Sequence, residues 1–217
     1  MKKQQIPIAS EGYPFILFCA FITLLCALLG LTVATFVGLL MTTFVTWFFR
    51  DPSRVIPDDP DAVICPADGR VIKIKEIDDD RFLKGKALKI SIFMNIFNVH
   101  VNRIPISGKV EGIIFKPGKF YSADNDKASL HNEYCALTMV TSSNIRYCVV
   151  QVAGLIARRI VCRAEKGDTI AAGDRYGMIR FGSRVDLYLP PETKVEVRLR
   201  QKVKSGETIL AYLNSGE

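Results

Sequence analysis

The 217-residue sequence has few of the residues and motifs that bind metals and nucleotides. It contains only two histidines, and its six cysteines form no C-x-x-C pair and do not cluster with either histidine. Neither an H-E-x-x-H motif nor a G-x-x-x-x-G-K-S phosphate loop occurs. We therefore expect neither a metal ion nor a nucleotide as cofactor. The cysteines are predicted to be reduced and buried in a cytosolic setting. They are Cys19, Cys26, Cys65, Cys135, Cys148 and Cys162.

A long stretch near the N-terminus has no charge: no acidic or basic side chain occurs between Glu11 and Arg50. As one helix, residues 14–49 would measure roughly 50 Å, well beyond the bilayer core of about 30 Å. We therefore predict a transmembrane or membrane-embedded helical hairpin over about 14–49, within an N-terminal anchor at residues 1–50. The competing interpretation is a cleaved signal peptide, but its apolar region would be shorter and would end at a small-residue cleavage site.

The formal net charge of +7 favours an anionic partner, either nucleic acid or an anionic membrane surface. The long apolar stretch favours the membrane, so we expect no nucleic-acid partner. Basic residues stand on both sides of this stretch, which by the positive-inside rule keeps both of its ends cytoplasmic. They are Lys2, Lys3, Arg50 and Arg54. The predicted location is the inner cell membrane, with the rest of the chain on the cytoplasmic face.

Beyond the anchor, prolines and acidic residues at 51–62 indicate a linker, and residues 63–217 read as a β-rich domain. Short alternating runs separated by Gly and Pro turns predict a mainly β fold. Two similar turns, at 167–174 and 203–208, indicate a pseudo-symmetric barrel or sandwich.

Two local elements can be placed within this domain. The run at 63–64 and the alternating run at 70–77 flank the turn-like sequence Pro66-Ala67-Asp68-Gly69, which predicts a β-hairpin. A short helix is expected around 154–159.

Gly182-Ser183 comes just before an alternating run at 184–189, so Ser183 is predicted to begin a half-buried strand. A Gly-Ser pair at such a place is usually only a turn. His100, Asp68 and His131 also have ordinary interpretations: a structural histidine, a turn aspartate and a solvated loop histidine. None of these residues indicates chemistry alone.

Taken together, several longer motifs resemble the phosphatidylserine decarboxylase family, in particular its short, membrane-anchored class. They are Phe48–Pro52, Phe97–Arg103, Lys127–Ser129 with Asn132-Glu133, Gln151–Ile160 and Arg180–Asp186. The resemblance covers nearly the whole chain. It implies a lipoyl-like barrel/sandwich hybrid fold for the catalytic domain.

The resemblance also implies that the chain cuts itself between Gly182 and Ser183. The products would be a large subunit, 1–182, and a small subunit, 183–217, which remain together as a heterodimer. Ser183 would become a covalently bound pyruvoyl group that forms a Schiff base with the substrate and decarboxylates phosphatidylserine to phosphatidylethanolamine.

The residue types fit this chemistry. Glycine at 182 removes the Cβ that would obstruct attack by the Ser183 hydroxyl on the preceding carbonyl. His100 is our hypothesis for the base that takes the hydroxyl proton and for the later proton donor, with Asp68 orienting it. Arg103 and Arg184 are candidates for binding the lipid phosphate and carboxylate.

The chain departs from long family members at the flanks of the cleavage point, which are Phe181 and Arg184, and at Arg103, where those members carry a second histidine. Two alternatives stay open. The same chemistry could act on another serine-headed lipid such as archaetidylserine, or the chain could be a non-catalytic, membrane-tethered lipoyl-like binding module.

Overall fold

The computed structural model describes residues 7–118, 132–154, 159–180 and 183–213. The chain divides into two compact units, Met1–Ser53 and Arg54–Glu217. Most of the segment predicted as a linker, from Arg54 onward, thus belongs to the second unit. His131, Gly182 and most of the helix predicted at 154–159 lie outside the described residues.

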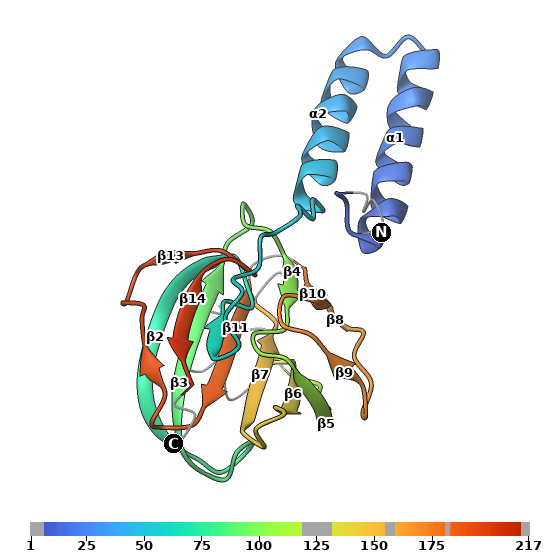
Figure 1. The fold of residues 1–217 in the computed structure, drawn as a ribbon. Helices are drawn as coiled ribbons and strands as arrows, with labels where there is room; N and C mark the ends of the chain where they lie inside the picture. Colours follow the sequence, from blue (N-terminus) through green and yellow to red (C-terminus); the bar gives the residue numbers. More distant parts are fainter. Residues whose placement is uncertain (1–6, 119–131, 155–158, 181–182, 214–217) are drawn as a thin grey trace. The chain divides into compact units, whose positions relative to one another are not determined.

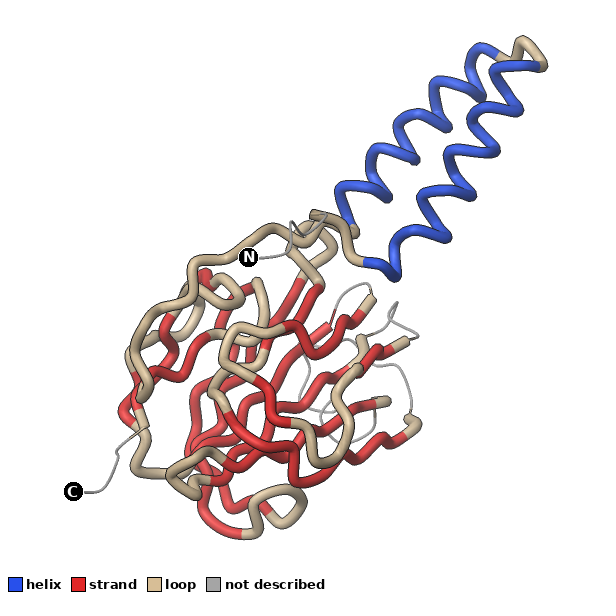
Figure 2. The backbone as a smooth tube through the Cα atoms, turned by 45° about the vertical axis from the view of Figure 1, so that its right-hand side comes forward, coloured by secondary structure: helices blue, strands red, loops and turns tan. Residues whose placement is uncertain are grey.

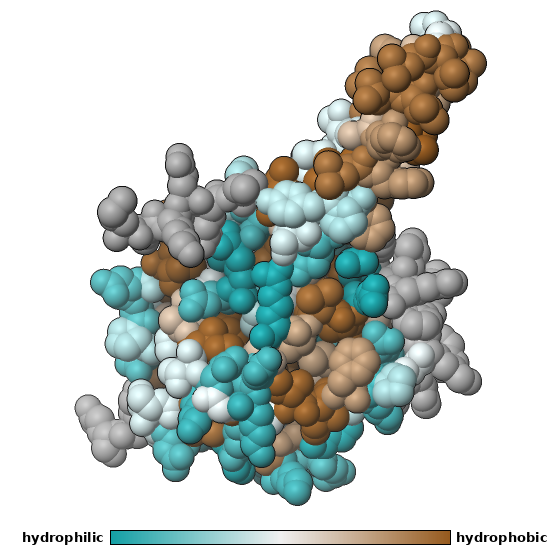
Figure 3. Space-filling model, turned by 90° about the vertical axis from the view of Figure 1, so that its right-hand side faces the viewer, coloured by the Kyte–Doolittle hydropathy of each residue, from teal (hydrophilic) through white to brown (hydrophobic). Residues whose placement is uncertain are grey.

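The first unit is a pair of apolar helices, α1 (Tyr13–Leu28) and α2 (Thr32–Phe48), preceded by the short 3-10 helix η1 (Ser10–Gly12) (Figures 1 and 2). The helices approach closely, since a Cβ on Gly38 would lie 2.5 Å from Thr23 Oγ1. Apolar side chains cover the visible surface of this hairpin (Figure 3). Residues Ser10–Leu28 are long and apolar enough to cross a membrane, whereas α2 is shorter.

The second unit is built of short strands, which confirms the predicted mainly β fold (Figures 1 and 2). The strands are β1 (Ala62–Ile64), β2 (Gly69–Asp79), β3 (Gly85–Met94), β4 (Val101–Arg103), β5 (Gly108–Lys116), β6 (Tyr134–Val140), β7 (Arg146–Val152), β8 (Ile160–Cys162), β9 (Thr169–Ile170), β10 (Arg175–Ile179), β11 (Ser183–Leu189), β12 (Lys194–Val195), β13 (Lys202–Val203) and β14 (Ile209–Tyr212). The largest sheet has the order β13-β2-β3-β11-β7-β6-β5-β9. Two three-stranded sheets, β1-β14-β12 and β4-β10-β8, complete the described fold. The lipoyl-like detail stays a prediction.

The predicted hairpin between 63–64 and 70–77 is wrong. Strand β1 pairs with β14 near the end of the chain, and β2 pairs with β3. The connecting segment bonds elsewhere: the Cys65 amide donates to Thr208 O, and Pro66 O accepts from the Arg103 amide. Because distant segments take these backbone groups, β1 and β2 cannot fold back on one another.

Strand β11 lies in the middle of the large sheet, between β3 and β7. All seven of its residues are buried, so the prediction of a half-buried strand is wrong. One face packs into the main core through Val185 and Leu187, and the other carries Arg184, Asp186 and Tyr188. The alternation in the sequence therefore separates two buried environments, one apolar and one charged.

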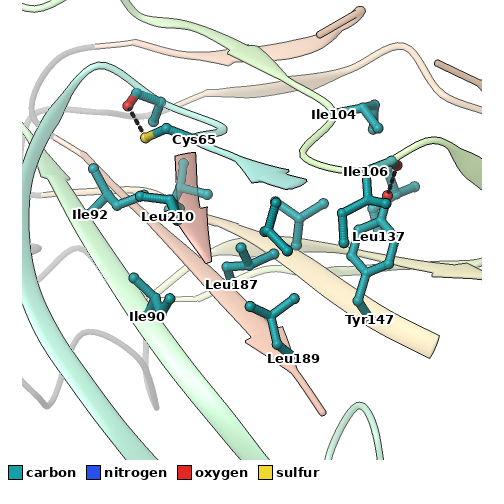
Figure 4. Close-up of a cluster of buried hydrophobic side chains, with 14 of the residues drawn as sticks. Cys65, Ile90, Ile92, Ile104, Ile106, Leu137, Tyr147, Leu187, Leu189 and Leu210 are labelled. Atoms are coloured by element: carbon teal, nitrogen blue, oxygen red, sulfur yellow. Dashed lines mark hydrogen bonds between the residues drawn. The ribbon is translucent and has the colours of Figure 1, made fainter. Parts of the chain in front are cut away.

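The main core lies between the sheets (Figure 4). The Tyr147 hydroxyl donates a hydrogen bond to Ile106 O within it, and the Cys65 thiol donates to Ala67 O. All six cysteines are free, but three of them, Cys19, Cys26 and Cys162, are only partly buried, which corrects the prediction for those three.

Candidate functional site

Ser183 is the first residue of β11 and pairs with Met94 of β3. Its exposed fraction is 0%, and its Oγ has no hydrogen-bond partner among the described residues. A buried hydroxyl without a partner lowers stability by roughly 1–3 kcal/mol. Most buried polar groups in native structures have a hydrogen-bond partner, so this hydroxyl needs an explanation.

His100 immediately precedes β4 and is fully buried. Its carbonyl oxygen accepts a hydrogen bond from the Ile179 amide at 3.4 Å, and the next residue, Val101, pairs with Met178 of β10. Strand β10 ends only four residues before Ser183. The sequence motif around His100 thus lies alongside the segment that leads to the predicted cleavage point.

Two buried amides connect this region to Ser183. Asn102 Oδ1 accepts from Gln151 Nε2 at 2.9 Å, and Asn102 Nδ2 lies 3.8 Å from the sulfur of Met94, the strand partner of Ser183. Gln151 pairs with Val185, which places it on the same sheet face as Ser183. Gln151 Oε1 has no partner within the described ranges. His100, Asn102, Gln151 and Ser183 are all 0% exposed.

Gly177 in β10 permits this arrangement. A Cβ there would lie 2.2 Å from Val161 O and 2.8 Å from Gln151 Nε2. Any side chain would therefore push β10 away from β8 or displace Gln151.

Asp68 is held by groups that the sequence did not reveal. Arg54 Nη2 lies 2.8 and 3.0 Å from its two carboxylate oxygens, and the Ser205 amide donates to it at 2.8 Å. Arg54 also bonds Glu207 at 3.3 Å. Among the described residues, the hydrogen bonds of the Asp68 side chain go to Arg54 and Ser205, and its predicted role of orienting His100 stays a prediction.

Arg103 and Arg184, the two predicted substrate-binding arginines, lie in different places. Arg103 Nη1 donates to Gly173 O at 3.0 Å, and a Cβ on Gly206 would lie 3.0 Å from Arg103 Cδ and 3.3 Å from Arg54 Cβ. Arg103 is therefore beside the Arg54–Asp68 pair, and its role in binding the substrate stays a prediction.

Arg184 faces the opposite side of the sheet from Ser183. Its Nε lies 2.8 Å from Asp186 Oδ1, and Lys89 Nζ lies 2.9 Å from Asp186 Oδ2. We call these three buried residues the outer ion cluster. Burial lowers the pKa of Lys89, and the attraction of Asp186 opposes that change.

Part of this site could have been found in the sequence. Asn102 and Gln151 are amides at core-facing positions of apolar strands, a pattern that indicates a buried polar network. Arg54 gives no such signal, because it stands in a polar, proline-rich segment. No group of three or more His, Cys, Asp or Glu side chains that could hold a metal ion occurs within the described ranges.

Comparison with known proteins identifies the family. Residues 41–211 match the family model for phosphatidylserine decarboxylase. A phosphatidylserine decarboxylase proenzyme of Desulfotalea psychrophila is 56% identical over 213 residues, which cover 98% of this chain and 100% of the relative. Proenzymes of the same name from Syntrophotalea carbinolica and Geobacter metallireducens are 48% and 49% identical, again over 98% of this chain and 100% of each relative. The chain therefore belongs to the phosphatidylserine decarboxylase family.

Proposed function

We propose that this chain is a proenzyme that cuts itself between Gly182 and Ser183 and then decarboxylates phosphatidylserine to phosphatidylethanolamine. The observation that carries the proposal is the Ser183 hydroxyl, fully buried at the start of a central strand with no hydrogen-bond partner among the described residues. Family membership supports the substrate and the reaction class.

In the cleavage step, Ser183 Oγ attacks the carbonyl carbon of residue 182. The new C–O ester bond forms as the peptide C–N bond breaks, and His100 takes the hydroxyl proton. Elimination of the ester and hydrolysis of the resulting dehydroalanine release ammonia and leave a pyruvoyl group at position 183. Asp68, fixed by Arg54, is the proposed partner that orients His100.

The residues around position 183 fit a pyruvoyl group. A small, uncharged carbonyl-bearing group there would be buried, and the neutral Gln151 amide, which is bonded to Asn102, lies on the same sheet face. Once formed, it supplies a conjugated carbonyl that accepts the electrons released as carbon dioxide leaves. His100 would then return a proton to the former α-carbon, and Arg103 would hold the lipid phosphate or carboxylate.

Strand order supports a lasting heterodimer. After cleavage β11 would belong to the small subunit, yet its neighbours β3 and β7 both belong to the large one. The apolar hairpin would hold the enzyme at the inner membrane, with the second unit reaching headgroups of the cytoplasmic leaflet.

Intact mass measurement with denaturing electrophoresis tests the proposal. The wild-type chain should yield a fragment of residues 183–217 that is lighter than its sequence by one ammonia, and Ser183→Ala should remain full length and inactive. An active preparation that contains only uncut chain would overturn the proposal and favour the binding module.

The His100→Ala variant tests the proposed base and should not be cleaved. Full cleavage of this variant would show that His100 is not the base. Parallel assays with phosphatidylserine and archaetidylserine decide between the two substrates.

A further inference from the structure

The turn between β3 and β4 presents apolar side chains to solvent close to the site. It reads Asn95-Ile96-Phe97-Asn98 and projects past the end of β3 (Figure 1). The Phe97 side chain is 60% exposed, although His100 only three residues later is fully buried. The turn begins directly after Met94, the strand partner of Ser183.

Hydrogen bonds at both ends hold this turn in shape. Asn98 Oδ1 accepts from the Asn95 amide at 2.9 Å, and Asn95 Oδ1 accepts from the Phe97 amide at 2.9 Å. The Asn98 amide also donates to Asn95 O at 3.1 Å. Asx turns of this kind fix the backbone locally. Phe97 is therefore held outward by a closed turn rather than exposed on a loose segment.

Two basic residues lie on the strands next to the end of β3, just before the turn. Phe93, one residue before Met94, pairs with Arg70 of β2, and Arg70 pairs with Lys202 of β13. Both basic side chains are exposed, and the Arg70 guanidinium donates to the carbonyl of Arg200 at 3.1 Å. Cross-strand neighbours lie on the same sheet face, so Arg70 and Lys202 form a basic edge next to the apolar turn.

We propose that the Asn95–Asn98 turn and the basic pair Arg70 and Lys202 form a docking surface for an anionic bilayer, with Phe97 inserted at the boundary between headgroups and acyl chains. This inference rests on the proposed function, because it places His100 near the headgroups of the lipid substrate. An apolar tip flanked by cations is the combination that binds membrane interfaces. Each cation near an anionic surface adds about 1 kcal/mol.

The size of the surface favours lipid over a protein partner. A stable protein interface buries more than about 1,000 Å² in total. The turn offers two apolar side chains, Ile96 and Phe97, of which Ile96 is already partly buried. A bilayer needs no matching surface and can accept one aromatic ring.

Depth-dependent fluorescence quenching tests the docking surface apart from the chemistry. The starting protein is the full-length Ser183→Ala variant, which cannot cut itself under the proposed function. Its single tryptophan, Trp47, is first replaced by phenylalanine. Phe97→Trp in this Trp47→Phe background should be quenched by brominated lipids in vesicles that contain anionic lipid. Phe115→Trp is the matched control, because Phe115 on β5 is 55% exposed and four strands away from β3 in the sheet order.

The proposal is supported if quenching at position 97 clearly exceeds quenching at position 115. The quenching at 97 should also fall when salt is added, and in the double variant Arg70→Gln/Lys202→Gln. Equal quenching at both positions, or none at 97, overturns it. So does an emission shift at 97 that depends on protein concentration and not on lipid, which would indicate a protein partner.

An activity measurement gives the second readout. In the processed enzyme that retains its N-terminal hairpin, Phe97→Ser should lower turnover of phosphatidylserine in vesicles by about tenfold. This loss is equivalent to about 1.4 kcal/mol. Turnover of a short-chain phosphatidylserine below its micelle concentration should stay within about twofold, as should both activities of Phe115→Ser. Equal losses on both substrates would show a damaged site instead of lost docking. If the wild-type enzyme turned over neither substrate, that result would count against the proposed function. The quenching experiment would still test the docking surface.

Discussion

The two faces of strand β11 carry polar residues in opposite ways. On the inner face, the Ser183 hydroxyl and Gln151 Oε1 are buried with no hydrogen-bond partner among the described residues. On the outer face, Arg184 and Lys89 both contact the carboxylate of Asp186 at 2.8–2.9 Å. Ser183 thus carries a buried hydroxyl without a partner among the described residues, whereas the next residue, Arg184, belongs to a group of paired charges.

This difference separates the roles of the two faces. Buried charges are tolerated when they are paired, and removing one partner of such a group is strongly destabilising. An unpaired neutral group weakens the fold less than an unpaired buried charge does. We therefore expect substitutions on the outer face to act through stability, and those on the inner face to act through cleavage and turnover.

Asp186→Ala should have the largest effect on stability. It leaves two cations, Arg184 and Lys89, without their buried counter-charge, which we expect to lower the free energy of unfolding by about 3–5 kcal/mol. Chemical denaturation of the purified chain in detergent measures this change. At low temperature, where the variant still folds, cleavage at Ser183 should proceed. A variant that is as stable as wild type yet uncut would reverse the assignment of the two faces.

Gln151→Leu should have an intermediate effect. It removes the donor to Asn102 Oδ1, a loss of about 1–3 kcal/mol for a buried acceptor left unpaired. The double variant Asn102→Leu/Gln151→Leu should recover part of that stability, because both partners are then apolar. Cleavage, followed by electrophoresis over time, should be slower in both variants. Wild-type cleavage in the double variant would show that these amides serve only packing.

Lys89→Met should have the smallest effect, because Arg184 still pairs with Asp186, and its signature is a changed dependence of stability on alkaline pH. Burial holds the pKa of Lys89 below its ordinary value, so between the folded and the unfolded pKa the unfolded chain binds more protons. Wild-type stability should therefore rise with pH through that window, by about 1.4 kcal/mol for each unit by which the pKa is lowered. The variant lacks this contribution, and Arg184 still pairs with Asp186. Unfolding curves of both chains at neutral and alkaline pH give the difference, and identical slopes would contradict the expected shift.

The sequence predicted what depends on local pattern. The uncharged stretch gave the two helices, and the alternation after Gly182 placed Ser183 at the start of a strand. Motif resemblance singled out His100, whose burial no local pattern predicts.

What the sequence left out depends on distant contacts. Strand β1 pairs with β14 nearly 150 residues later, and Asp68 is bound by Arg54 from a segment that looks like a linker. The charges of β11 look solvent-exposed until Lys89, almost 100 residues earlier, is placed beside Asp186. Only the folded sheet brings these partners together.

The place of β11 in the sheet order also bears on the timing of maturation. The strand that carries Ser183 pairs with β3 on one side and β7 on the other, and both precede it in the chain. Under the proposed self-cleavage, a chain that stalls on the ribosome before β11 is made should remain inert. Activation would then report that Ser183 and the strands on both sides of it have been made, without help from a protease.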